Sequence, residues 1–429
     1  MPGDFSIGAA PMLVPPGPWE VIEGNCVTAK GFKAQGMHAG MRAKGTKADL
    51  ALVVADEAAV AGGVFTQNVM CAAPVTLSKD NLAKSDRIKA VIINAGQANA
   101  ATGRLGMEDA VKSAQAVAQQ LGCKPEEVLV QSTGVIGQRI KFEKLIEGLP
   151  TLAAGLGSEY EDGHRAAVAI TTTDLVSKSC ALKMKLSDGT EVTLGGMCKG
   201  SGMIHPNMAT MLGTLTCDAA VDAQVWRGML SRCIRDTFNQ ISVDGDTSTN
   251  DCVFALASGA AGNAPITDAE SEDGKLLESA LKATLAGMCK AIAWDGEGAT
   301  ALVECKCTGA ATDDDARTVS RSVVCSSLAK AAIYGHDPNW GRIACAAGYS
   351  GVQFDQEKLA VTLGGIKLME NGQPLAFDKK EASNYLKSQC DVHGVVNIDV
   401  SIGDGPGEGV AWGCDLSYDY VKINAEYTT

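Results

Sequence analysis

Aromatic residues and histidine are scarce in this chain, and its cysteines form no metal-binding pattern. Phe, Trp and Tyr make up 5% of the 429 residues, and there are five histidines. No two histidines have the spacing of metal ligands, and the 15 cysteines include no C-x-x-C, so no metal is expected. The sequence instead favours an intracellular protein with reduced thiols.

Basic charge and long apolar runs are also lacking. The formal net charge of −13 argues against nucleic-acid binding, which needs a basic surface. No stretch approaches about 18 uninterrupted apolar residues, so no membrane span is expected. The first residues lack the features of a secretory signal or a transit peptide. We therefore expect a soluble protein of the cytoplasm, or of the chloroplast or mitochondrial interior if a leader has been removed.

The stretch KGSGMIHPNMATML, residues 199–212, places a threonine directly after Ala209. A threonine hydroxyl is a weak nucleophile until a base lies beside it, and its own α-amino group becomes that base when the preceding bond is cut. The pKa of such an amine, about 8, is close to neutral pH. We predict that Thr210 attacks the carbonyl of Ala209, cuts the chain and then serves as the catalytic nucleophile. The alternative is a buried strand that contains a threonine.

Two charged side chains stand beside glycine turns. Lys199 precedes a turn that could hold its ammonium against a substrate carboxylate. Glu297 lies between two glycines, which would expose its carboxylate to a substrate ammonium. Each side chain alone is equally consistent with an ordinary exposed charge.

Taken together, the distinctive segments resemble the glutamate/ornithine N-acetyltransferases of arginine biosynthesis, which cut themselves before the Thr of an A-T-M-L segment. The resemblance covers nearly the whole chain. Besides residues 199–212, the matching segments are NAGQANAATG (94–103), STG (132–134), TTTD (171–174), SVDGDTSTND (242–251), GEGAT (296–300) and HDPNWGRIACAAGYSG (336–351). Cys217, between Thr216 and Asp218, is a mild departure from the family pattern.

The resemblance implies an α/β fold of the αββα-sandwich type that forms a single interlocked catalytic unit. It also implies an alpha chain of residues 1–209 and a beta chain of residues 210–429, which begins with the nucleophile. Two of each fragment are expected to form a heterotetramer.

The family resemblance assigns roles to individual residues. Thr133 and Gly134 form the oxyanion hole, which stabilises the negative oxygen of the tetrahedral intermediate. The extra Thr171 leaves the choice within the triplet 171–173 open, and the loop 242–251 is expected to support the site. The expected substrate-binding residues are Thr172, Lys199, Thr210, Glu297, Asn424 and Thr429.

The implied reaction moves acetyl from N2-acetyl-L-ornithine to L-glutamate through an ester on Thr210. No cofactor is needed, although acetyl-CoA is possible as a co-substrate of a bifunctional member. One rival interpretation is a self-cleaving aminopeptidase with water as acceptor. Another is a non-enzymatic metabolite-binding protein, whose chain would stay whole.

Local patterns also predict individual elements. Alternation predicts two short strands at 50–55 and 63–66, and a strand over 410–420 with Trp412 and Tyr418 on one face. A further strand is expected over 127–131, and it should stop before the Thr133-Gly134 pair.

Overall fold

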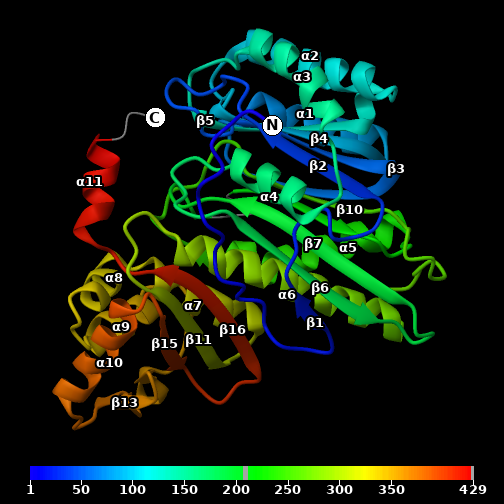
Figure 1. Ribbon diagram of the computed structural model, residues 1–429. Helices are drawn as coiled ribbons and strands as arrows, with labels where there is room; N and C mark the ends of the chain where they lie inside the picture. The colour runs from blue at the N-terminus through cyan, green and yellow to red at the C-terminus, as the bar shows by residue number, and fades with distance from the viewer. Residues whose placement is uncertain (206–210, 427–429) are drawn as a thin grey trace.

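The computed structural model describes residues 1–205 and 211–426. Within these residues the strands form two mixed sheets (Figure 1). The larger sheet contains, in spatial order, β1 (Glu20–Ile22), β6 (Lys178–Lys185), β7 (Glu191–Lys199), β8 (Leu212–Cys217), β10 (Cys252–Ala257), β3 (Leu50–Phe65), β4 (Arg87–Gln97) and β5 (Val128–Val135), with β2 (Phe32–Met37) paired to β3. The smaller sheet contains β14 (Gln373–Pro374), β13 (Ile366–Glu370), β12 (Ala360–Leu363), β15 (Val395–Ser401), β11 (Leu302–Ala310), β16 (Gly407–Cys414) and β9 (Ile241–Ser242).

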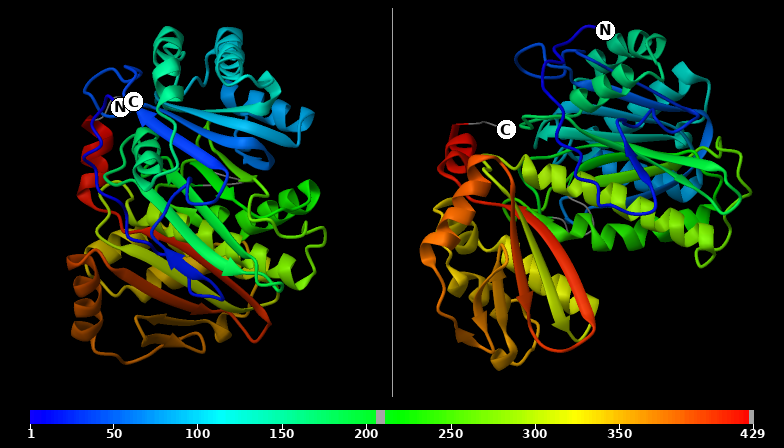
Figure 2. Two further views of the ribbon diagram at one scale, coloured as in Figure 1. Left: turned by 45° about the vertical axis from the view of Figure 1, so that its right-hand side comes forward. Right: turned by 60° about the horizontal axis from the view of Figure 1, so that its bottom comes forward.

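The helices lie around and between these sheets (Figures 1 and 2). The α-helices are α1 (Ala73–Lys84), α2 (Gly103–Leu121), α3 (Phe142–Ala154), α4 (Tyr160–Ala169), α5 (Ala223–Asp236), α6 (Glu272–Trp294), α7 (Asp313–Cys325), α8 (Ser327–Tyr334), α9 (Trp340–Gly348), α10 (Lys379–Asp391) and α11 (Tyr418–Glu426). In the part of the chain that the structure describes, none of them is long and apolar enough to cross a membrane.

The long strand β3 joins two layers of the larger sheet. Its first part pairs with β2 and β4, whereas residues 60–65 pair with β10. The register with β4 shifts between Val54 and Ala59, and such a bulge bends and twists a strand. One continuous strand therefore replaces the two short strands predicted at 50–55 and 63–66.

Alternate side chains of β3 point into different cores, as a strand's twofold period requires. Leu50 and Leu52 pack with α2 and α3, whereas Ala51 and Val53 belong to the core between the two strand layers. On the far side, α5 and α6 cover β6, β7, β8 and β10. The order helix, strand, strand, helix confirms the α/β sandwich expected from the family resemblance.

Helix α6 connects this sandwich to the smaller sheet. It contacts β6 and β7 of the larger sheet and also β11 and β16 of the smaller one. Its sequence is rich in Ala and Leu, and residues on most of its faces are buried, as expected for a helix enclosed between layers. Strand β9 and the loop after it make a second connection, since β9 belongs to the smaller sheet and β10 to the larger.

The predicted strand over 410–420 is wrong in its second half. Strand β16 ends at Cys414, and helix α11 begins at Tyr418. Asp415 ends the strand because its carboxylate accepts hydrogen bonds from the backbone N–H groups of Thr300 and Ala301, at 2.7 and 3.1 Å. The chain is thereby directed toward the pocket described below.

Leu281→Ala tests the importance of α6. Leu281 is fully buried in the core beneath the larger sheet, so its truncation should lower the free energy of unfolding by about 2–5 kcal/mol. Ser279→Ala, at an exposed position of the same helix, should change it by less than about 0.5 kcal/mol. Urea unfolding of both variants measures the difference, and equal losses would contradict a buried α6.

Candidate active site

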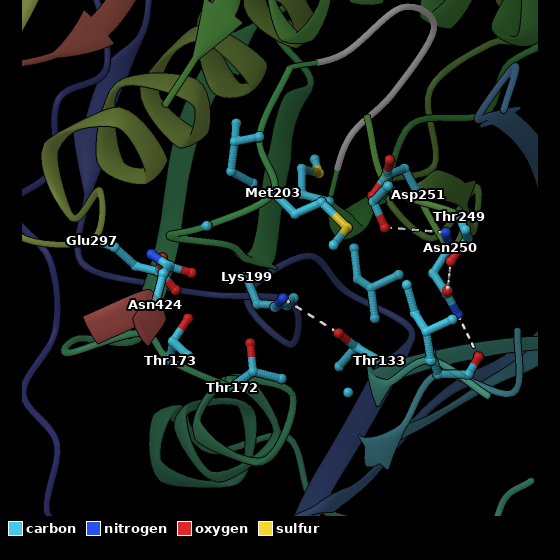
Figure 3. A pocket seen from close by; sticks show the side chains of 18 residues that line it. Thr133, Thr172, Thr173, Lys199, Met203, Thr249, Asn250, Asp251, Glu297 and Asn424 are labelled. Carbon is cyan, nitrogen blue, oxygen red and sulfur yellow. Dashed lines mark hydrogen bonds between the residues drawn. The ribbon is translucent and has the colours of Figure 1, made fainter. Parts of the chain in front are cut away.

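A cavity of about 170 Å³ lies where the ends of β5, β7, β8 and β10 meet the loops from the smaller sheet (Figure 3). Its lining combines hydroxyl, amide and charged side chains with a few apolar ones. The lining residues are Ala98, Thr133, Gly134, Ile136, Thr172, Thr173, Lys199, Gly202, Met203, Ile204, Met211, Leu212, Ser248, Thr249, Asn250, Asp251, Glu297 and Asn424.

Thr133 and Gly134 reach this cavity from β5. The strand runs on to Val135, so these residues lie within it and not beyond its end as predicted. Gly134 has φ +129°, and a Cβ there would lie 2.3 Å from the carbonyl carbon of Gly96 on β4. Only glycine fits this close approach of the two strands.

Lys199 ends β7 and points toward Thr133 (Figure 3). Its Nζ donates a hydrogen bond of 3.3 Å to the Thr133 Oγ1, and the residue is 8% exposed. Burial lowers the pKa of this ammonium, and the nearby carboxylates of Asp174 and Asp251 offset the effect only in part. A buried cation facing a polar cavity is suited to hold an anionic group.

The threonine triplet divides into two kinds of residue. Thr171 is fully buried, and its hydroxyl donates to the carbonyl of Val168 at 2.7 Å, so it does not line the cavity. Thr172 and Thr173 both do, and the hydroxyl of Thr173 lies 2.8 Å from that of Ser201. The choice of a substrate-contacting threonine is thereby narrowed to Thr172 and Thr173.

A buried ion group fixes the turns around Lys199, and the motifs did not predict it. The Nζ of Lys178 lies 2.7 Å from Asp174 Oδ1 and 2.6 Å from Asp295 Oδ2, and all three side chains are at most 3% exposed. Asp174 also accepts hydrogen bonds from the backbone N–H groups of Thr172 and Gly200, at 2.8 and 2.7 Å.

These charges also shift the pKa values within the group. Burial alone would raise the pKa of Asp174, but the charges of Lys178 and Lys199 outweigh it and hold the pKa below its usual range. Burial likewise opposes the charged form of Lys178, yet the two carboxylates raise the pKa of its ammonium. Lys178 and Asp174 therefore stay ionised at neutral pH.

The loop 242–251 supports the site, as the resemblance implies. The Asp244 carboxylate accepts hydrogen bonds from the backbone N–H groups of Met203 and Ile204, at 2.6 and 3.0 Å. Asn250 Nδ2 donates to the carbonyls of Ala98 and Ser132, at 2.5 and 2.8 Å. The loop thus ties the glycine turn after β7 to the strand that carries Thr133.

Glu297 and Asn424 form the opposite side of the cavity (Figure 3). Asn424, on α11, donates a hydrogen bond of 2.7 Å to Glu297 Oε2. The backbone N–H of Glu297 donates to the carbonyl of Ser201 at 2.9 Å, which joins this side to the glycine turn. Gly298 has φ +71°, so the predicted sharp turn after Glu297 is present.

The structure thus brings together most of the predicted site residues. Those that line one cavity are Thr133, Gly134, Thr172, Lys199, Glu297 and Asn424.

Three predicted positions, Ala209, Thr210 and Thr429, lie outside the described residues. The chain neighbour of Thr210, Met211, does line the cavity.

No residue of the motif 336–351 lines the cavity. Asn339 of this motif begins α9 by accepting a hydrogen bond from the Arg342 N–H at 3.3 Å, and the Arg342 guanidinium donates to the carbonyl of Leu328 at 2.9 Å. Both contacts are structural. In the described part of the chain, no group of histidine, cysteine or carboxylate side chains could hold a metal ion.

Lys178→Met tests the buried ion group. The variant leaves two buried carboxylates without their shared cation, so we expect the free energy of unfolding to fall by about 3–5 kcal/mol. Lys183→Met is the matched control on the same strand, since Lys183 is 38% exposed in its 3.3 Å ion pair with Glu191. It should cost less than about 1 kcal/mol. Denaturant unfolding measures both, and a similar small loss in each would contradict the assignment.

Comparison with known proteins supports one family. A sequence model of the ArgJ family matches residues 33–429. The chloroplastic arginine biosynthesis bifunctional protein ArgJ of Ostreococcus lucimarinus is 58% identical over 433 residues, covering 100% of this chain and 94% of that protein. The protein of the same name from Sorghum bicolor is 57% identical over 423 residues, covering 99% and 91%.

Two of the solved structures that match each cover about half of the chain or less. The arginine biosynthesis bifunctional protein ArgJ of Bacillus halodurans is 47% identical, with a TM-score of 0.48, and covers 51% of this chain and 100% of that one. The ornithine acetyltransferase of Mycobacterium tuberculosis, solved in complex with ornithine, is 39% identical, with a TM-score of 0.41, and covers 44% and 100%. On the extent of the family match and the identity to the plant and algal proteins, this chain belongs to the ArgJ family, as its motifs predicted.

Proposed function

We propose that this chain is a bifunctional acetyltransferase of arginine biosynthesis, which moves acetyl from N2-acetyl-L-ornithine to L-glutamate through an ester on Thr210. One observation carries the proposal: six of the residues predicted for this chemistry, Thr133, Gly134, Thr172, Lys199, Glu297 and Asn424, line a single cavity together with Met211, the chain neighbour of Thr210. The names of the algal and plant relatives describe the same bifunctional class.

The active form arises when Thr210 attacks the carbonyl of Ala209 and the resulting ester is hydrolysed, which leaves chains 1–209 and 210–429. Strand pairing would hold the fragments together after the cut. Strand β7, before the cut, pairs antiparallel with β8 after it, and β3 pairs with β10. The fragments would therefore remain one catalytic unit, and two of each would form the heterotetramer.

In the first transfer step, the Thr210 hydroxyl attacks the acetyl carbon of the donor while the Thr210 α-amino group accepts the hydroxyl proton. Negative charge develops on the acetyl oxygen, where the Thr133 hydroxyl and the Gly134 N–H would donate to it. The intermediate collapses, the proton passes to the leaving nitrogen, and ornithine departs. The α-amino group of glutamate, as the free amine, then attacks the ester and restores Thr210.

Charged groups on two sides of the cavity would hold the amino-acid ends. Lys199 suits a carboxylate, and Glu297 with Asn424 suits an ammonium. Thr172 and the terminal Thr429 are assigned as further contacts. Because acetyl returns to glutamate in each cycle, no cofactor is needed, and acetyl-CoA serves as the second donor in the bifunctional activity.

We also assign the enzyme to the chloroplast interior, because the algal and plant relatives are named as chloroplastic proteins. Immunolocalisation in the source cells tests this compartment.

Thr210→Ala should remain one full-length chain and gain no acetyl group, because it lacks the attacking hydroxyl. The wild type should give two fragments, the second starting at Thr210 and gaining an acetyl group when N2-acetylornithine is added. Thr210→Ser keeps a hydroxyl and should still cut. Denaturing mass analysis distinguishes these products, and active wild-type protein with an intact 209–210 bond would refute the mechanism.

Thr133→Val should slow acetylation of Thr210 by about 10²–10³-fold, since it removes one donor to the oxyanion. Thr193→Val is a control of similar burial, 6% against 9% exposed, at a position that does not line the cavity. Stopped reactions analysed by mass give both rates. Ornithine release that does not depend on glutamate would instead indicate the hydrolytic aminopeptidase.

A further inference from the structure

Asp251 lies beside the chain at Met211, the residue that follows Thr210. It directly precedes β10, whose first residue, Cys252, is the parallel partner of Leu212 on β8. The Cys252 N–H donates a 3.0 Å hydrogen bond to the carbonyl of Met211. Asp251 therefore directly precedes the residue whose backbone N–H binds the Met211 carbonyl.

The Asp251 carboxyl group is buried and incompletely paired. Asp251 is 3% exposed and lines the cavity, and its Oδ2 has no hydrogen-bond partner among the described residues. Burial raises its pKa well above the usual range, and the opposing charge of Lys199 and hydrogen bonds from Ser248 do not cancel the effect. Orphaned buried polar atoms are rare in proteins and call for an explanation.

The other ionisable groups of the cavity lining each have a hydrogen-bond partner there. Lys199 donates to Thr133, and Glu297 accepts from Asn424 on the opposite side. Figure 3 shows Asp251 on the side of Thr249 and Asn250, away from Glu297. Among the described residues of the cavity lining, Asp251 is thus the acid whose carboxyl group has a buried oxygen without a hydrogen-bond partner.

The self-cutting step needs such an acid. Before the cut, the nitrogen of Thr210 belongs to an amide and is not basic, so the α-amino group that serves later turnover does not yet exist. When the bond between Ala209 and Thr210 breaks, the departing nitrogen must receive a proton. This need follows from the self-cleavage in the proposed function, on which the present inference rests.

We propose that the carboxyl group of Asp251 donates the proton that allows the Thr210 nitrogen to leave the Ala209 carbonyl carbon. The Thr210 Oγ–C bond forms, the C–N bond breaks, and the Asp251 proton moves to nitrogen. The proton released from the Thr210 hydroxyl returns to the Asp251 carboxylate. Water then hydrolyses the ester, which gives the Ala209 carboxylate and the free Thr210 hydroxyl.

The test follows the cutting of newly made full-length chain. Cell-free synthesis is stopped, the protein is moved to buffers from mildly acidic to mildly alkaline pH, and denaturing gels follow the cut with time. Asp251→Asn should cut at least about 100-fold more slowly, the usual contribution of a general acid. Asp251→Glu, which keeps the carboxyl group, should recover part of the rate.

Asp246→Asn is the matched control. Asp246 is in the same loop but is exposed and does not line the cavity, so its loss should leave the cutting rate unchanged. A general loss of negative charge from the loop would instead slow both variants equally and overturn the proposal. Thermal unfolding of the uncut chains shows whether each variant is folded.

The pH profile separates a proton donor from a merely structural residue. Because the protonated carboxyl group is required, the wild-type cutting rate should fall as pH rises through the pKa of Asp251. Lys199 and Cys252 are the neighbouring groups that also titrate, so Cys252→Ala should keep this fall. A wild-type rate that only rises toward alkaline pH would overturn the proposal, and this measurement decides the matter if Asp251→Asn does not fold.

Failure of this inference can be told from failure of the proposed function. If the wild type stays whole and still transfers acetyl, the self-cleavage mechanism is wrong. If the wild type cuts and Asp251→Asn cuts equally fast, only the role of Asp251 is wrong.

Discussion

A buried lysine between two carboxylates holds the site together. Lys178 joins Asp174, in the threonine segment, to Asp295, at the end of α6, at 2.7 and 2.6 Å. Taking three charges out of water costs several kcal/mol each, so the group adds less stability than its short contacts suggest. Its effect is geometric, because the same Asp174 carboxylate fixes the backbones of Thr172 and Gly200. The two turns around Lys199 therefore keep one arrangement.

Two layers of strands position Thr133 and Gly134, the residues proposed for the oxyanion hole. The close approach of Gly134 to Gly96 on the neighbouring strand leaves no room for a side chain. The β3 strand, shared between the layers, keeps β4 and β5 in register with β10. The position of Thr133 relative to Lys199 is thus a property of the whole sandwich and not of a flexible loop.

The sequence allowed several residues of the cavity lining to be predicted because each lies in a short segment of unusual composition. Thr133, Lys199 and Glu297 stand beside glycines, and the segments that contain them resemble those of one family. Asp251 could not be singled out, because the same loop contains Asp244 and Asp246. Their different burial depends on how the loop crosses between sheets, which no local pattern records.

The misplaced strand over 410–420 has a similar cause. Trp412, Cys414 and Tyr418 alternate with polar residues as they would along a strand, and this period continues past the true end. The strand stops because Asp415 binds the backbone at Thr300 and Ala301, more than a hundred residues earlier in the chain. Such a long-range contact overrides the local alternation.

The cavity is built by two bodies of the molecule. Thr133 and Lys199 belong to the sandwich, whereas Glu297 and Asn424 belong to the part of the chain that carries the smaller sheet. An amino acid bound at both ends would connect these two parts of the molecule. Binding in the cavity would then hold the two parts more rigidly together. The amide hydrogens of α11 and of the turn at Glu297 would exchange more slowly with substrate bound than without it.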